Sequence, residues 1–206
     1  MYSLITKKTE MKQIQLTKPG GLDKLQLVEI YIPIIRDNEI LVKVAASSLN
    51  FNDLLVALGS NLTEDNRVLL GDASGEVVEI GKNVSKWQVG DRIMSVCFPK
   101  WITGQPKREN LSFIGENEDG YATEYIALPE TAVTKIPQGW NPKEVATLAC
   151  AGLTAWRALL NEGNLQAGET VLTQGTGGVS IFALQLAKSM EAKVIATSSS
   201  DEKLEN

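Results

Sequence analysis

The chain has 206 residues, of which 43% are hydrophobic and 22% charged, and this balance predicts a folded globular protein, neither a disordered tail nor a small disulfide scaffold. Its net charge of -5 has the wrong sign for a general attraction to nucleic acid phosphates, so we expect no nucleic acid partner. No apolar run approaches the ~20 residues of a membrane-spanning helix and residues 1–12 lack the apolar core of a signal peptide, so we expect a soluble, cytoplasmic protein without a membrane partner.

The first part of the chain has the pattern of β structure. Residues 1–10 carry no pattern and are expected to form a loose extension, whereas alternation of polar and apolar side chains begins at residues 13–16. Turn residues then separate a series of short predicted strands at residues 24–30, 39–46, 75–80, 91–96, 121–127 and 132–136. This succession predicts an antiparallel barrel domain over residues 11–137.

One predicted helix and one long loop interrupt the strands. The helix covers residues 52–58, where leucines fall at helical spacing and Gly59 stands in the position of a C-terminal cap. Residues 98–118 are charged, contain proline and have no clear period, which predicts a long surface loop. That loop is either a lid or an excursion without function.

The period changes after Pro142. Apolar residues repeat at helical spacing until Gly163, and residues 170–174 then have the pattern of a buried strand. A tight loop at 175–178, a helix over 179–190, a strand over 193–197 and a further element from Asp201 follow. The alternation predicts linking helices and the first part of a Rossmann segment, a doubly wound parallel sheet, over residues 138–206, so the expected fold class is α/β plus β.

The loop between these two strands, GTGGVS at residues 175–180, has the spacing of a dinucleotide-binding fingerprint. Gly175 allows the sharp turn, Gly177 lets a pyrophosphate approach the backbone, and the small Ser180 brings helix and strand together. The predicted cofactor-binding residues are therefore Gly175, Thr176, Gly177, Gly178 and Val179, at the start of a helix that favours anions. The alternative is a purely structural turn. No Gly-Lys-Ser/Thr follows, which excludes a Walker A loop.

The end of the second strand indicates which dinucleotide fits. An NAD site places an acidic residue about 20 positions after the first glycine. Here Ser198, Ser199 and Ser200 stand there, with Lys203 one helical turn further on. Hydroxyl groups and a cation suit a 2′-phosphate, which favours NADP(H), although Asp201 keeps NAD open.

The composition also limits the metal and nucleophile chemistry. The chain has no histidine and only two cysteines, Cys97 and Cys150, which lie far apart in sequence. Zinc sites draw mainly on His and Cys ligands, and the Ser-His and Cys-His nucleophile pairs need histidine. We therefore expect no zinc site and interpret both cysteines as small buried hydrophobic residues.

Several motifs in order resemble the medium-chain dehydrogenase/reductase family, in its zinc-free, quinone oxidoreductase-like branch. They are ASSLNFND at 46–53, GDASGEV at 71–77, WQVGDR at 87–92, AGLTAW at 151–156 and the loop at 175–180. The resemblance implies a GroES-like catalytic domain followed by a Rossmann cofactor domain. The two zinc-ligand positions of zinc-dependent relatives are lost, because residues 49–53 hold no cysteine and Asp72 stands where those relatives have a histidine.

The resemblance also implies a reaction and site residues. Zinc-free members transfer hydride from NADPH to a quinone or an α,β-unsaturated carbonyl compound. By resemblance, the catalytic residues Asn50 and Asp53 line the nicotinamide end of the cofactor cleft, and Thr154 contacts the nicotinamide or its ribose. Each has a structural alternative, since Asn and Asp favour helix N-termini and a helical Thr can bond back to the helix carbonyls.

Only one strand–helix–strand unit follows residue 169, whereas a complete doubly wound domain has about six strands. We therefore expect a C-terminally truncated reductase, which is either active or a fragment. The alternative is a non-catalytic barrel protein that uses the residual Rossmann segment as a partner surface, and an alcohol dehydrogenase is a third hypothesis. The resemblance implies a homodimer, but through strands that this chain does not contain.

Overall fold

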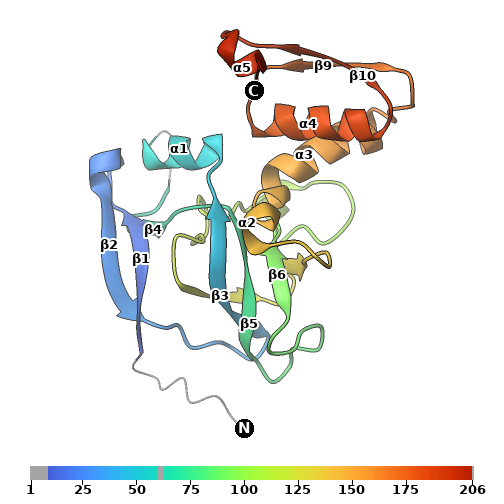
Figure 1. Cartoon of the computed structure of the whole chain (residues 1–206). Helices are drawn as coiled ribbons and strands as arrows, with labels where there is room; N and C mark the ends of the chain where they lie inside the picture. The colour runs from blue at the N-terminus through green and yellow to red at the C-terminus, as the bar shows by residue number, and fades with distance from the viewer. Residues whose placement is uncertain (1–8, 60–62, 206) are drawn as a thin grey trace. The chain divides into compact units, whose positions relative to one another are not determined.

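The computed structural model describes residues 9–59 and 63–205 of the chain (Figure 1). Its contacts divide the chain into two compact units, Met1–Ala149 and Cys150–Asn206, and each is described by itself below. The sequence places the domain boundary after residue 137, and this boundary stays a prediction. Helix α2 (Pro142–Val145), which follows it, packs on strands of the first unit.

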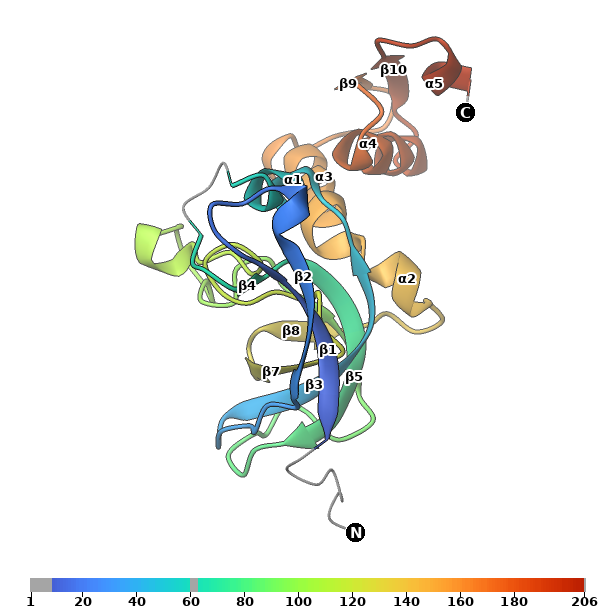
Figure 2. The same cartoon turned by 90° about the vertical axis from the view of Figure 1, so that its left-hand side faces the viewer.

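Two antiparallel sheets make up the described part of the first unit. One has the strand order β7-β3-β5-β6-β8 and the other the order β2-β1-β4. The strands of the larger sheet are β3 (Glu39–Ser48), β5 (Asp72–Ile80), β6 (Arg92–Ser95), β7 (Tyr125–Pro129) and β8 (Val133–Lys135). Those of the smaller sheet are β1 (Glu10–Leu16), β2 (Leu25–Tyr31) and β4 (Arg67–Val68), with β1 and β2 side by side in Figure 2. The antiparallel GroES-like fold expected from the sequence is confirmed.

Residues 120–124 join the two sheets. Backbone hydrogen bonds run from Ala122 N to Leu69 O at 2.9 Å and from Glu124 N to Lys12 O at 3.1 Å, while Glu124 O accepts from Val44 N at 2.9 Å. The predicted strand over 121–127 is therefore wrong in its first half, because residues 121–124 pair in turn with segments of both sheets before β7 begins. Glu10, predicted to lie in a loose extension, opens β1. Thr9 O accepts from Ile32 N at 3.0 Å, and residues 1–8 of the predicted extension fall outside the described residues.

Apolar side chains of both sheets form the interior. The main cluster includes Ile40, Val42, Val77, Trp87 and Ile93, mostly from β3, β5 and β6. A second cluster joins Leu16 of β1 to Val56 and Ala57 of helix α1 (Phe51–Ala57). The alternating pattern of the strands thus produces one buried face per sheet, and α1 is held against the smaller sheet by apolar contact.

Gly59 ends α1 as the sequence predicts. Its φ is +75°, which strongly favours glycine, and its N–H donates to Val56 O at 2.9 Å. A Cβ at this position would lie 2.3 Å from the carbonyl oxygen of Pro19, so a side chain has no room. The conformation and the crowding both require glycine here.

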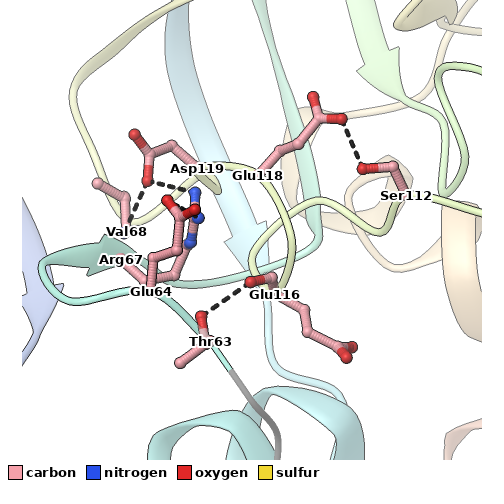
Figure 3. Close-up of polar contacts among 8 residues, drawn as sticks. All are labelled: Thr63, Glu64, Arg67, Val68, Ser112, Glu116, Glu118 and Asp119. Atoms are coloured by element: carbon pink, nitrogen blue, oxygen red, sulfur yellow. Dashed lines mark hydrogen bonds and ion pairs between the residues drawn. The ribbon is translucent and has the colours of Figure 1, made fainter. Parts of the chain in front are cut away.

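The predicted loop after β6 contains a single helical turn, η2 (Arg108–Asn110), and its far end is tied to β4 (Figure 3). Arg67 is buried and contacts Asp119 Oδ1 and Glu64 Oε2, each at 3.0 Å. The same Asp119 oxygen accepts from Val68 N at 3.2 Å, and Thr63 Oγ1 donates to Glu116 O at 2.8 Å. Residues 116–119 are therefore anchored, which a charged, aperiodic sequence did not predict.

The second unit contains a parallel pair of strands covered on one side by a helix. Strands β9 (Thr170–Gln174) and β10 (Lys193–Thr197) pair in parallel, and helix α4 (Gly178–Ser189) connects them and packs on both (Figure 1). The predicted helix and strands are confirmed, with Ala183 and Ala187 of the predicted stripe buried. A short helix, α5 (Glu202–Glu205), follows.

The helical region before β9 is less regular than its apolar period predicts. After α2 it consists of a π-helical segment, η3 (Leu148–Gly152), helix α3 (Leu153–Trp156) and a second π-helical segment, η4 (Arg157–Glu162). The region is helical, as the spacing predicts, but i→i+5 hydrogen bonding replaces the α-helical pattern on both sides of α3.

Candidate functional site

The N-terminus of α1 brings together the two predicted catalytic residues. Asn50 is the N-cap, with extended φ and ψ of −111° and 161°, and it forms a capping box with Asp53. Within the box Asn50 N donates to Asp53 Oδ2 at 2.7 Å. The capping alternative considered from the sequence is confirmed, whereas a role at a cofactor stays a prediction.

Asp53 also ties α1 to the beginning of β5. Its second oxygen, Oδ1, accepts from Gly71 N at 3.1 Å, and the residue is 5% exposed. Burial raises the pKa of the Asp53 carboxyl above its ordinary value of 3.8, while the hydrogen bonds from Asn50 N and Gly71 N act in the opposite direction. Asp53 is therefore a structural carboxylate whose ionisation is linked to burial.

A third residue, Asp72, completes this cluster. It is fully buried, and its Oδ2 accepts from Asn50 Nδ2 at 3.0 Å and from Ser48 Oγ at 3.3 Å. Ser48 and Asp72 are direct partners in the β3–β5 ladder, so the backbone fixes their separation. The sequence indicated Asp72 only as the position at which zinc-dependent relatives have a metal-ligating histidine. A carboxylate inside the otherwise apolar and small run at 68–75 is the signal that could have found it.

Tyr121 interacts electrostatically with Asp72 of this cluster. Its side chain is buried, and its hydroxyl has no hydrogen-bond partner among the described residues. Burial raises the pKa of the Tyr121 phenol, and electrostatic interactions with Asp72 and Cys97 act in the same direction. The phenol therefore stays protonated at neutral pH.

An apolar pocket of about 510 Å³ adjoins the same helix end. It lies between α1 and the β1–β2 hairpin, and every described residue that lines it is apolar except Asn50 and Asp53. Phe51 and Leu54 contribute one face of α1 to it. The pocket has the size and lining of a small-molecule site with a polar group at one point.

In the second unit, the glycine-rich turn lies between β9 and α4. Gly175 has φ +84°, a conformation that favours glycine. Gly177 is the N-cap of α4, with φ −78°, and a Cβ built on it would meet nothing within 4 Å. The fold of the described residues therefore explains a glycine at 175 and gives no reason for one at 177.

The first turn of α4 is open to an external hydrogen-bond acceptor. Its N-cap glycine has no side chain that could accept from the first N–H groups, and Gly177, Gly178 and Val179 are exposed. Ser180 Oγ donates to Gln174 O at 3.1 Å, which ties the helix to β9. The arrangement is that of a helix terminus suited to an anion.

The residues predicted to select the dinucleotide follow β10. Gly175 N donates to Thr197 O at 2.8 Å, so the glycine turn and the end of β10 are adjacent. Ser198 Oγ accepts from Ser200 N at 3.3 Å, and Lys203 and Asp201 are exposed at α5. Thr154 is exposed on α3, which packs against α4. All the predicted cofactor-binding residues thus lie in the second unit, and Asn50 and Asp53 lie in the first.

The described residues contain no group of three His, Cys, Asp or Glu side chains that could hold a metal ion. Both cysteines are half-buried thiols, not the fully buried residues expected from the sequence, and Cys97 Sγ donates to Ala149 O at 2.9 Å. No helix in the described ranges is long and apolar enough to cross a membrane.

Comparisons with known proteins agree with this architecture. The family model of the alcohol dehydrogenase GroES-like domain matches residues 36–138. A zinc-type alcohol dehydrogenase-like protein of Schizosaccharomyces pombe is 38% identical over 90% of this chain and 56% of its own length. An acryloyl-coenzyme A reductase of Sulfurisphaera tokodaii is 28% identical over 90% of this chain and 58% of its own.

Among solved structures, the quinone oxidoreductase from Coxiella burnetii superposes with a TM-score of 0.75 at 33% identity, covering 93% of this chain and 57% of that one. The chain therefore spans a little more than half the length of the curated relatives that it matches.

Proposed function

Because the chain belongs to the family built on the alcohol dehydrogenase GroES-like domain, the medium-chain dehydrogenases and reductases, we propose that it acts as an NADP(H)-dependent oxidoreductase on quinones or α,β-unsaturated carbonyl compounds. Relatives named as an acryloyl-coenzyme A reductase and a quinone oxidoreductase support these two substrate classes. Both classes share an electrophilic carbon conjugated to a carbonyl group.

The observation that carries the proposal is the open space at Gly177. If the fold alone required glycine at position 177, a Cβ built there would clash with neighbouring atoms or the backbone φ would be positive. Neither holds, because φ is −78° and no atom lies within 4 Å. A ligand whose pyrophosphate packs on the backbone at this point explains the residue, and the start of α4 supplies N–H donors for it.

The neighbouring residues fit the remainder of a dinucleotide. In this proposal Gly175, Thr176, Gly178 and Val179 surround the pyrophosphate, and Thr154 contacts the nicotinamide side. When bound, the nicotinamide supplies the two electrons and the hydrogen that the substrate carbon accepts.

The 2′-phosphate of NADP(H) is assigned to the polar segment after β10. Ser198, Ser199 and Ser200 offer hydroxyl donors, and the exposed Lys203 offers a positive charge. Asp201 is exposed beside them, and its carbonyl oxygen accepts from Leu204 N at 2.8 Å, which gives it a place in the first turn of α5. We therefore assign it a structural role and prefer NADP(H) over NAD.

In the first unit, this chain's own polar groups serve the carbonyl end of the substrate. Asn50 lines the apolar pocket and carries side-chain N–H donors, which stabilise negative charge that develops on a carbonyl oxygen. Asp53 is buried and holds the helix end that carries Asn50 by accepting from Asn50 N. No metal is required in this scheme, and we propose that the protein is zinc-free.

The test is a titration of the full chain with NADPH and with NADH, followed by tryptophan fluorescence and by calorimetry. We expect saturable binding with NADPH preferred, and consumption of NADPH in the presence of a quinone or an enone. Absence of binding to both nucleotides would refute the proposal, and tighter binding of NADH would refute the choice of cofactor.

A further inference from the structure

A second pocket, of about 440 Å³, lies on the other side of the layer that borders the apolar pocket. In three pairs of consecutive residues, one member lines the apolar pocket and the other lines the second pocket, because successive side chains of an extended chain point to opposite faces. These pairs are Ile14 with Gln13, Leu69 with Val68, and Ala122 with Thr123. Ala122 O accepts from Ile14 N at 2.8 Å and Ala122 N donates to Leu69 O at 2.9 Å, so the three segments form one layer between two separate pockets.

Gln13 is a polar residue at an interior position of this layer. Along β1, Met11 and Gln13 are buried, whereas Lys12 and Ile14 between and after them are exposed. Gln13 is 7% exposed and lines the second pocket, and its side-chain amide forms no hydrogen bond with any residue in the described ranges 9–59 and 63–205. A buried amide without partners is unfavourable, because its two N–H donors and its oxygen have all lost water. The lining of the second pocket thus presents an unused donor beside an unused acceptor.

The charged residues of the lining disfavour an ionic ligand. Among the described residues that line the pocket, acidic side chains outnumber basic ones, and each acid already has a cationic partner. These ion pairs are Glu39 with Arg36, Glu118 with Lys100, and Asp119 with Arg67. A carboxylate ligand would meet an excess of negative charge, and an ammonium ligand would have to compete with the cations present. Buried apolar side chains such as Met11 and Ile126 line the pocket as well, so it favours a neutral ligand with an apolar part.

We propose that the second pocket binds a neutral primary carboxamide with a short apolar chain, whose amide pairs with the amide of Gln13. The carbonyl oxygen of the ligand accepts from Gln13 Nε2, and its NH₂ group donates to Gln13 Oε1. A primary carboxamide carries a donor and an acceptor on the same side, so both hydrogen bonds form at once, whereas a ketone offers the acceptor alone. This site does not depend on the proposed function, because none of the residues assigned to that function lines the second pocket.

The experiment uses the full chain labelled with ¹⁵N and three probes of equal size and shape, which are hexanamide, 2-heptanone and hexanoate. The side-chain amide signals of Gln13 are identified by their loss in Gln13→Met and report on this pocket alone. We expect hexanamide to shift these signals and to bind on the order of tenfold more tightly than 2-heptanone, which corresponds to ~1.4 kcal/mol. Hexanoate should bind more weakly than hexanamide. Equal or tighter binding of either competitor, or unchanged Gln13 signals with hexanamide, would overturn the ligand assignment.

Variants of Gln13 separate recognition from folding. Gln13→Met keeps the length of the side chain and removes the amide, so hexanamide affinity should fall about tenfold while 2-heptanone binds at least as tightly as hexanamide. The variant should unfold at the same or a higher urea concentration than the wild type, because the buried amide is gone. Gln13→Asn retracts the amide by one methylene group and serves if the methionine variant does not fold. It should weaken hexanamide binding several-fold.

Gln15→Met is the matched control, since it makes the same change two residues further along β1 at a half-buried side chain that is not part of the described lining. It should bind hexanamide as the wild type does. Unchanged hexanamide affinity in a folded Gln13 variant, or an equal loss in Gln13→Met and Gln15→Met, would refute the pairing of the two amides. Shifts by hexanamide of the Asn50 signals in place of those of Gln13 would refute it as well, since they would assign the ligand to the apolar pocket.

Discussion

The amide nitrogen of Gly175 donates to the carbonyl oxygen of Thr197 across 2.8 Å, which joins the turn after β9 to the end of β10. The pairing places the glycine-rich turn beside the residues that follow β10, although more than twenty positions separate them in the chain. The two parts of the proposed dinucleotide site can therefore be tested separately by substitution.

Substitution of Gly177 by alanine should leave folding intact and remove nucleotide binding. With φ −78° and free space where the methyl group would lie, the alanine fits, and the free energy of unfolding should stay equal or rise by about 0.4–1 kcal/mol. Affinity for NADPH should fall at least about tenfold, because the methyl group takes the place of the pyrophosphate. Thermal unfolding and nucleotide titration check both parts, and an unchanged affinity would contradict the proposed function.

Substitution of Gly175 by alanine should lower the stability of the protein, in contrast to the substitution at Gly177. Its φ of +84° is unfavourable for residues with a Cβ, so Gly175→Ala should lower the free energy of unfolding by about 1–2 kcal/mol even though no atom is near. Gly175→Asn serves as the control, because asparagine tolerates this region better and should lose less. Equal free energies of unfolding in urea for the wild type, Gly175→Ala and Gly175→Asn would contradict the prediction and show that the turn can adopt another backbone conformation.

Lys203 should contribute to the choice between NADPH and NADH. Its positive charge is exposed at α5, close in sequence to Ser198–200, and Lys203→Ala should weaken NADPH binding several-fold with little effect on NADH. Lys188→Ala, which removes an equal charge from the last turn of α4, is the control and should change neither affinity. A parallel loss in both variants would mean that general electrostatics, not a 2′-phosphate contact, sets the affinity.

Burial of Asp53 should make stability depend on pH in a defined direction. Since its pKa is raised above 3.8 in the folded protein, the folded state holds the proton more tightly than the unfolded state does. The contribution of Asp53 to stability is thus greatest below the unfolded pKa and declines as pH rises through the folded pKa. The free energy of unfolding of the wild type minus that of Asp53→Asn should therefore decrease over this window and then level off. A difference that increases with pH would show that the hydrogen bonds outweigh burial.

The two acidic partners of Arg67 should contribute unequally to the free energy of unfolding. Asp119 contacts both the guanidinium and Val68 N, whereas the carboxylate of Glu64 is almost fully exposed and contacts the guanidinium. Asp119→Ala should cost about 1–3 kcal/mol and Glu64→Ala less than about 1 kcal/mol in urea unfolding. The reverse order would mean that the anchoring of residues 116–119 contributes little.

Local patterns predicted most of the elements. Strand β10 occupies residues 193–197 as its apolar run indicated, and α1 ends at a glycine of positive φ as the sequence signal required. The pairing of Asn50 with Asp53 could also be predicted from the sequence, because a capping box lies within four consecutive residues. Interactions of this kind depend on neighbours in sequence, so the sequence carries them directly.

Contacts between distant segments could not be predicted in this way. The place of Asp72 depends on the pairing of β3 with β5, and the burial of Arg67 depends on Asp119, which lies 52 positions away. Residues 121–124 have the pattern of a strand but pair with two sheets. In each case tertiary pairing decides the outcome, and the roles of Thr154 and the turn residues toward a cofactor stay predictions.

The two-stranded sheet of the second unit has a consequence for handling the protein. Leu172 and Ile195 occupy equivalent places on β9 and β10 and are 57% and 54% exposed. Apolar side chains on paired strands are templates for self-association, so concentrated samples should aggregate first through this surface. A charged residue at position 172 is therefore a practical choice for keeping samples monodisperse during spectroscopy.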